Sequence, residues 1–123
     1  MNISIIGLGL IGGSIARDLK SQIYVRVSGV DSNESHCQMA LDLGIVDQII
    51  SLDEAMASSD VIIIAVPVDA LQQLLPTILN QIGDNQVLID VGSTKKLICD
   101  AVRGHEKRGR FIAAHPLAGT EFS

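Results

Sequence analysis

Three groups of residues that could support binding or catalysis follow apolar runs of the chain. The stretch GLGLIGGS comes directly after Ile3–Ile6, DVGSTKK lies at the end of Val87–Val91, and HPLAGTE follows Phe111–Ala114. The imidazole of His115 in the third stretch is suited to accept a proton near pH 7. Because glycine costs roughly 0.5–1 kcal/mol relative to alanine inside a helix or strand, the glycines of the first stretch indicate a tight turn or a close neighbour.

Gly7, Gly9 and Gly12 have the spacing G-x-G-x-x-G between an apolar run and an expected helix over Ile11–Lys20. Between a strand and a helix, this spacing permits a tight turn, close approach of the backbone to a pyrophosphate, and close packing of helix on strand. The free amides and the positive dipole end at the helix start would stabilise an anion without a basic side chain. The alternative is a glycine-rich turn with a structural role only.

Asp31 follows Gly12 by 19 residues, at the end of an expected strand over Tyr24–Val30. In dinucleotide-binding proteins, an acidic residue about 20 residues after the glycines binds the adenosine ribose. An aspartate accepts a hydrogen bond from the ribose 2′-hydroxyl and repels a 2′-phosphate, and Ser32 and Asn33 place no arginine beside it. The pattern therefore favours NAD over NADP. A simple cap at the strand end is the alternative role for Asp31.

Apolar runs and helical patterns alternate along the chain. Strands are expected at Ile3–Ile6, Tyr24–Val30, Val46–Ile50, Val61–Ala65, Val87–Val91 and Phe111–Ala114, and helices at Ile11–Lys20, Asn33–Leu43, Ser51 to about Ser58, Val68–Ile82 and Lys95–Val102. Strands that are apolar on both faces and alternate with helices indicate an α/β fold with a doubly wound, mostly parallel sheet. Ligands of such sheets bind at the carboxyl ends of the strands, where the three groups fall.

Several residues predict where helices begin and end. Ser32 or Asn33 would cap the second helix, and Gly44 stands where a left-handed residue ends it. Ser51 and Glu54 have the spacing of a capping box. Pro76 is expected to kink or split the helix in which it lies.

Composition excludes several classes of function. A chain of 123 residues with 47% hydrophobic residues fits one domain. A formal charge of −5 and 2% aromatic residues argue against binding to nucleic acid. Without a long apolar run or a signal sequence, we expect a cytoplasmic protein that does not bind a membrane. Cys37 and Cys99 lack the spacing of a zinc site or a disulfide framework, and His36 and His105 are expected on solvated helix faces.

Together with the glycine motif and the stretch ALDLGIVD, the sequences DVGSTKK and HPLAGTE resemble the prephenate and arogenate dehydrogenases of tyrosine biosynthesis. The resemblance covers all 123 residues, and HPLAGTE is its most specific element. It implies a dinucleotide-binding domain of an oxidoreductase that uses NAD. The implied reaction is the oxidative decarboxylation of prephenate to 4-hydroxyphenylpyruvate, with hydride transfer to the cofactor.

The resemblance also implies roles for individual residues. His115 would hydrogen-bond the substrate hydroxyl and accept its proton, and Ser93 would orient the histidine and approach the nicotinamide. The expected cofactor-binding residues are Gly7, Gly9, Leu10, Ile11, Gly12, Asp31, Val66, Pro67 and Ser93, and the expected substrate-binding residues are Ser93, Lys95, His115, Thr120 and Glu121. The alternatives are a turn histidine for His115, a helix N-cap for Ser93, and exposed polar positions for Lys95, Thr120 and Glu121.

Members of the family that this sequence resembles continue into a helical domain that forms a homodimer and completes the substrate pocket. We therefore expect the 123 residues to be the dinucleotide-binding part, which binds NAD but turns over prephenate poorly by itself. Three other functions stay open: an arogenate dehydrogenase, another NAD(P)-dependent reductase such as a 3-hydroxyacid enzyme, and a non-catalytic nucleotide-sensing module.

Overall fold

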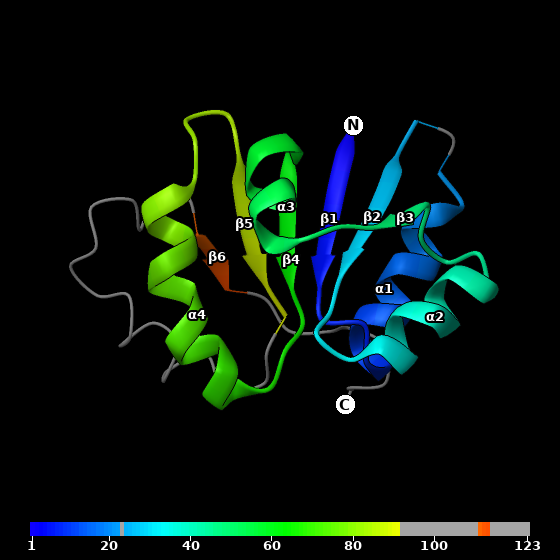
Figure 1. Cartoon of the computed structure of the whole chain (residues 1–123). Helices are drawn as coiled ribbons and strands as arrows, with labels where there is room; N and C mark the ends of the chain where they lie inside the picture. Colours follow the sequence, from blue (N-terminus) through cyan, green and yellow to red (C-terminus); the bar gives the residue numbers. More distant parts are fainter. Residues whose placement is uncertain (23, 92–110, 114–123) are drawn as a thin grey trace, which may run out of the picture.

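The computed structural model describes residues 1–22, 24–91 and 111–113. These residues form a six-stranded sheet in the order β3-β2-β1-β4-β5-β6, in which every neighbouring pair is parallel (Figure 1). The strands are β1 (Asn2–Ile6), β2 (Arg26–Val30), β3 (Gln48–Ile49), β4 (Val61–Ile64), β5 (Val87–Asp90) and β6 (Phe111–Ala113). The helices of the described part are α1 (Leu10–Lys20), α2 (Glu34–Asp42), α3 (Leu52–Ser58) and α4 (Val68–Gln81). The predicted doubly wound α/β fold is therefore confirmed.

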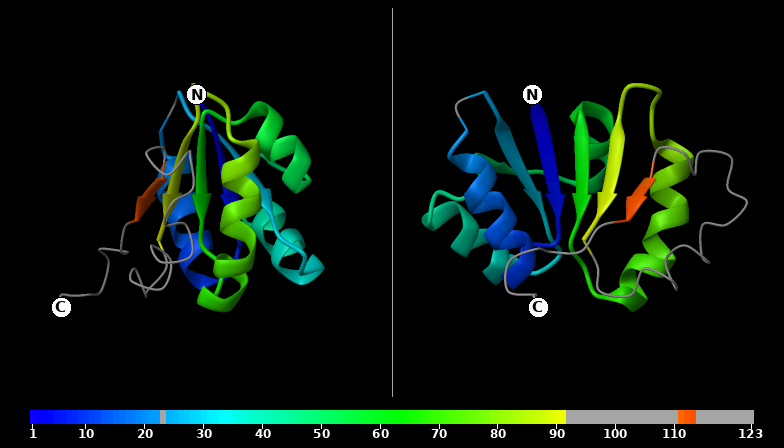
Figure 2. Two further views of the ribbon diagram at one scale, coloured as in Figure 1. Left: turned by 90° about the vertical axis from the view of Figure 1, so that its left-hand side faces the viewer. Right: turned by 180° about the vertical axis from the view of Figure 1, so that it is seen from behind.

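Each face of the sheet has its own apolar core. Ile5 and Ile63 pack with α1 and α2, whereas Ile62 and Ile64 pack with α3 and α4. Successive strand residues alternate between the faces because side chains of a strand point to opposite sides. Seen from behind, α1 lies on the near side of the sheet and α4 beyond it (Figure 2). Both faces are covered, which explains why β4 is apolar at every position and β1 is mostly apolar.

The local signals at helix ends are confirmed. The Asn33 side chain accepts a hydrogen bond from the His36 amide at 3.1 Å, and Gly44 has a φ of +69° just after α2. Both hydrogen bonds of the capping box between Ser51 and Glu54 are present at 3.1 Å. Pro76 does not split its helix, because α4 runs through it without interruption.

The apolar stripe of α4 explains this continuity. Leu71, Leu75, Ile78 and Leu79 are fully buried in the core on that face of the sheet. Proline removes one backbone hydrogen bond from a helix, but tertiary packing of an apolar face supplies most of the stability of helices in proteins. Here the packing outweighs the loss.

Some boundaries differ from those expected. Tyr24 is 82% exposed and precedes β2, which begins at Arg26 opposite Asn2 of β1. The third strand is two residues long because it is an edge strand that pairs with β2 alone. The helix expected at Lys95–Val102 lies outside the described residues. In the described part of the chain, no helix has the length and apolar character needed to span a bilayer.

We predict that Ser51→Ala lowers the free energy of unfolding by about 1 kcal/mol, because it removes the side-chain half of the capping box of α3. Urea denaturation followed by circular dichroism measures this difference. Ser35→Ala, at an exposed position in the first turn of α2, is the matched control and should change the value by less than about 0.5 kcal/mol. An equal loss in both variants would contradict the role of the capping box.

Candidate functional site

The carboxyl ends of β1, β2 and β4 meet at one edge of the sheet, the lower edge in Figure 1. A cavity of about 540 Å³ opens there, within the range of small-molecule sites. Its lining includes Gly7, Gly9, Asp31, Val66, Pro67 and Leu74. The structure thus brings together residues from three of the expected positions, namely the glycine turn, the end of β2 and the segment after β4.

The three motif glycines face different surroundings. Gly7 has a φ of +98°, and a Cβ atom there would lie 2.6 Å from the carbonyl oxygen of Ala65. A Cβ atom on Gly12 would lie 1.8 Å from the carbonyl oxygen of Gly7, so α1 touches the turn at this point. A Cβ atom on Gly9 would meet nothing within 4 Å. Two glycines therefore serve the fold, and the third borders open space.

The first turn of α1 leaves backbone donors beside this open space. The Gly13 amide bonds the carbonyl oxygen of Gly9 at 2.8 Å, but no hydrogen bond joins the amides of Leu10, Ile11 or Gly12 to another described residue. Gly9 provides no side-chain cap, and the first turn contains no acidic residue. The helix start can therefore bind an anion through backbone amides and the helix dipole.

Asp31 is tied to its surroundings by both carboxylate oxygens. Oδ2 accepts hydrogen bonds from the Leu8 amide at 2.7 Å and from His36 Nδ1 at 3.1 Å, while Oδ1 accepts one from the Asn33 amide at 2.8 Å. Partial burial would raise the pKa of Asp31, but these hydrogen bonds outweigh it and hold the pKa below the usual value of 3.8. The carboxylate is therefore ionised at neutral pH.

His36 is exposed, as expected, but its ring also contacts Asp31 and lines the cavity. The sequence analysis did not predict this contact between His36 and Asp31. His36 lies five residues after Asp31, in the first turn of the helix that follows β2. A histidine so soon after an acidic strand end is a signal that could have indicated the pair.

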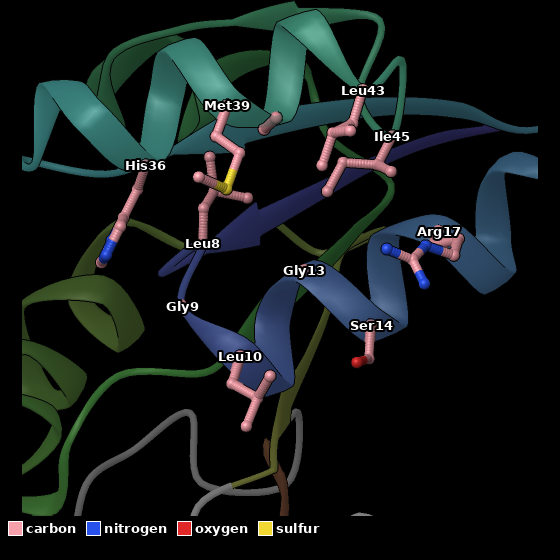
Figure 3. Close-up of a pocket in the computed structure, with 11 residues that line it drawn as sticks. Leu8, Gly9, Leu10, Gly13, Ser14, Arg17, His36, Met39, Leu43 and Ile45 are labelled. Carbon is pink, nitrogen blue, oxygen red and sulfur yellow. The ribbon is translucent and has the colours of Figure 1, made fainter.

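A second cavity of about 430 Å³ lies between α1 and α2 (Figure 3). Met39 of α2 and Leu43, the residue that follows this helix, face Leu8 and Ile45, and Arg17 of α1 also lines the cavity. Gly9 and His36 line both cavities. The sequence analysis did not predict this groove, although two exposed apolar side chains at i and i+4 of a helix were a signal for it.

Other predicted site residues cannot be placed. Ser93, Lys95, His115, Thr120 and Glu121 lie outside the described residues, as do Cys99 and His105. Of the predicted cofactor-binding residues in the described part, Leu10 is 90% exposed at the start of α1, and Ile11 is exposed beside it. Neither is among the residues that line the larger cavity. The strands β5 and β6 end at the same edge as β4, since Asp90 pairs with Ile64 and with Ala113.

Comparisons with known proteins agree with one another. Residues 15–123 match the family described as prephenate dehydrogenase, nucleotide-binding domain. The chain is 36% identical over 121 residues to a prephenate dehydrogenase of Bacillus subtilis. The alignment covers 95% of this chain and 33% of that protein.

Two solved structures share the fold. A prephenate dehydrogenase from A. aeolicus, in complex with hydroxyphenyl propionate and NAD⁺, is 32% identical with a TM-score of 0.82, covering 98% of this chain and 43% of that one. A Synechocystis arogenate dehydrogenase is 27% identical with a TM-score of 0.77, covering 98% and 42%. The chain spans about a third of the length of the Bacillus relative and less than half of either solved chain.

We predict that the same substitution changes the free energy of unfolding strongly at one motif glycine and little at another. Gly12→Ala should lower the free energy of unfolding by about 3 kcal/mol, because its Cβ atom would collide with the backbone of Gly7. Gly9→Ala should change it by less than about 0.5 kcal/mol, since the space there is open and the φ of −71° suits alanine. Equilibrium denaturation of both variants measures the difference, and comparable stabilities would contradict the close contact between α1 and the turn.

Proposed function

The chain belongs to the prephenate dehydrogenase nucleotide-binding domain family, and on that premise we propose that it binds NAD in the cavity beside Asp31. The observation that carries this proposal is the unpaired first turn of α1 next to the open side of Gly9. A diphosphate at this position would accept hydrogen bonds from the amides of Leu10 and Ile11. No cationic side chain is required.

The remaining parts of the dinucleotide fit the neighbouring walls of the cavity. Asp31 lines it and would accept a hydrogen bond from the adenosine ribose. Val66, Pro67 and Leu74 supply an apolar wall suited to the adenine ring. The residues present therefore fit the diphosphate, the ribose and the adenine ring of the cofactor.

The ionised state of Asp31 supports a preference for NAD over NADP. The pKa of this carboxyl lies below its usual value, so the group is a charged acceptor throughout the neutral range. A 2′-phosphate would bring a second negative charge against it, and like charges in contact cost several kcal/mol.

We predict that the 123-residue chain binds NAD⁺ and binds NADP⁺ at least about tenfold more weakly. Gly9→Ala is the matched binding-site variant, because it should keep the fold while its methyl group occupies space next to the diphosphate. We expect Gly9→Ala to weaken the binding of NAD⁺ by about tenfold or more. Isothermal titration calorimetry measures all three affinities, and equal binding of NAD⁺ by both proteins would contradict this placement of the cofactor.

We further propose that the whole protein oxidatively decarboxylates prephenate, with arogenate as the alternative substrate. The names of the Bacillus, A. aeolicus and Synechocystis proteins support these two substrates. Because these relatives are more than twice as long, we propose that the chain acts with a following helical domain that forms a homodimer. The bound nicotinamide supplies the acceptor for the hydride that leaves the substrate.

Within this proposal, His115 accepts the proton of the substrate hydroxyl as the carbonyl group forms. Ser93 orients the imidazole, and Lys95, Thr120 and Glu121 contribute to the substrate pocket. Strands β5 and β6 precede these residues in the sequence and end at the same sheet edge as β4, which supports the assignment. Aromatisation with loss of carbon dioxide makes the step irreversible.

We predict that His115→Asn, in a protein that includes the following domain, lowers kcat with prephenate by about 10²- to 10⁴-fold, the usual contribution of a general base. The affinity for NAD⁺ should stay within about threefold, because the proposed cofactor contacts come from other residues. Steady-state kinetics and calorimetry measure the two quantities. Unchanged kcat would exclude His115 as the base, and assays with arogenate decide between the substrates.

A further inference from the structure

We define the phosphate-binding turn as Gly7–Gly9. Its middle residue, Leu8, contacts β2 and the residue just after it through both its backbone amide and its side chain. The Leu8 amide donates to Oδ2 of Asp31 at 2.7 Å, just after the strand. The Leu8 side chain is 6% exposed and packs over Gly29 of the same strand, where a Cβ atom would lie 2.7 Å from its Cδ1 atom. The turn therefore takes its position from β2 as well as from β1.

Further hydrogen bonds hold Asp31 in place, so that it can fix the position of the turn. The Asn33 amide fixes Oδ1, His36 shares Oδ2, and Cys37 Sγ bonds the backbone carbonyl oxygen of Asp31 at 3.3 Å. A carboxylate offers about four acceptor positions. Residues of the described part use three of them, so Oδ1 keeps about one for a ribose hydroxyl.

We propose that Asp31 is a positioning residue for the phosphate-binding turn, acting through the Leu8 amide, in addition to its contact with the ribose. The inference rests on the proposed function, because it concerns the same nucleotide site. Its consequence is that residue 31 affects the binding of a diphosphate even when the nucleotide has neither a 2′- nor a 3′-hydroxyl group. A residue that served the ribose hydroxyls alone would have no such effect.

The sign of the effect separates positioning from charge. A carboxylate near a diphosphate repels it, so removal of the charge alone would strengthen the binding of 2′,3′-dideoxy-ADP, which has no ribose hydroxyl for Asp31 to bind. Loss of the Leu8 anchor would weaken it, because the amides at the start of α1 would no longer be held in register with the phosphates. The two explanations therefore predict opposite changes for one ligand.

Two substitutions remove the anchor in different ways. Asp31→Ala removes both carboxylate oxygens, so that the Leu8 amide loses its acceptor. Asp31→Glu keeps the charge but moves the carboxylate by one methylene group. Gln38→Ala is the matched control, since Gln38 lies on the exposed side of α2 and bonds only Asp42 at 2.8 Å among the described residues.

We expect both Asp31 variants to bind 2′,3′-dideoxy-ADP about 5- to 10-fold more weakly than the wild-type chain, and Gln38→Ala to match the wild type. The affinity for ADP should fall further, because the ribose contact disappears as well. Calorimetric titration measures the affinities, and thermal unfolding checks that each variant is folded. Unchanged or tighter binding of 2′,3′-dideoxy-ADP by the folded Asp31 variants would overturn the inference.

Failure of the inference and failure of the proposed function are distinguishable in the wild-type chain. If the wild type binds neither ADP nor NAD⁺, the nucleotide site itself is wrong, and the inference falls with it. If it binds both and the Asp31 variants bind 2′,3′-dideoxy-ADP as well as the wild type does, only the positioning role is wrong.

A measurement without any substitution gives a further test. The amide proton resonance of Leu8 should shift on acidification together with protonation of the Asp31 carboxyl, at a pH below the usual value of 3.8. A Leu8 resonance that does not follow this titration would contradict the anchor.

Discussion

The contact between Gly12 of α1 and the carbonyl oxygen of Gly7 is the constraint on which the site depends. A side chain at position 12 has no room, since its first atom would lie 1.8 Å from that oxygen. This contact sets the start of α1 directly against the end of β1. The amides at the start of the helix, which have no partner in the described part of the chain, consequently lie at the sheet edge where β1, β2 and β4 end. The candidate anion site is a result of how closely helix and strand pack.

The candidate anion site lies in a chain with a formal charge of −5. The overall field does not attract a dinucleotide, so local donors must hold it. The described part supplies them as backbone amides, which have fixed directions and need no side-chain ordering. Asp31 adds a negative charge close to the same place, and its ties to Leu8, Asn33 and His36 keep that charge in a fixed position.

The two cavities share a wall formed by Gly9 and His36. Both are lined mainly by apolar side chains, but Asp31 borders one of them, whereas Arg17 borders the groove between α1 and α2. His36 occupies the boundary because α2 begins immediately after Asp31 and directs its first turn toward the glycine-rich turn. The short connection between β2 and α2 thus determines what borders the candidate site.

The sequence by itself determined the class of fold and most helix and strand positions. Apolar runs such as Ile3–Ile6 and the capping box at Ser51 depend on contacts between near neighbours in the chain, and the glycine spacing with Asp31 indicated the site. Only the tertiary structure decided that Leu8 binds Asp31, that His36 joins the pair, and that α4 continues through Pro76. These features depend on strand register, helix placement and core packing between distant residues, which no local pattern specifies.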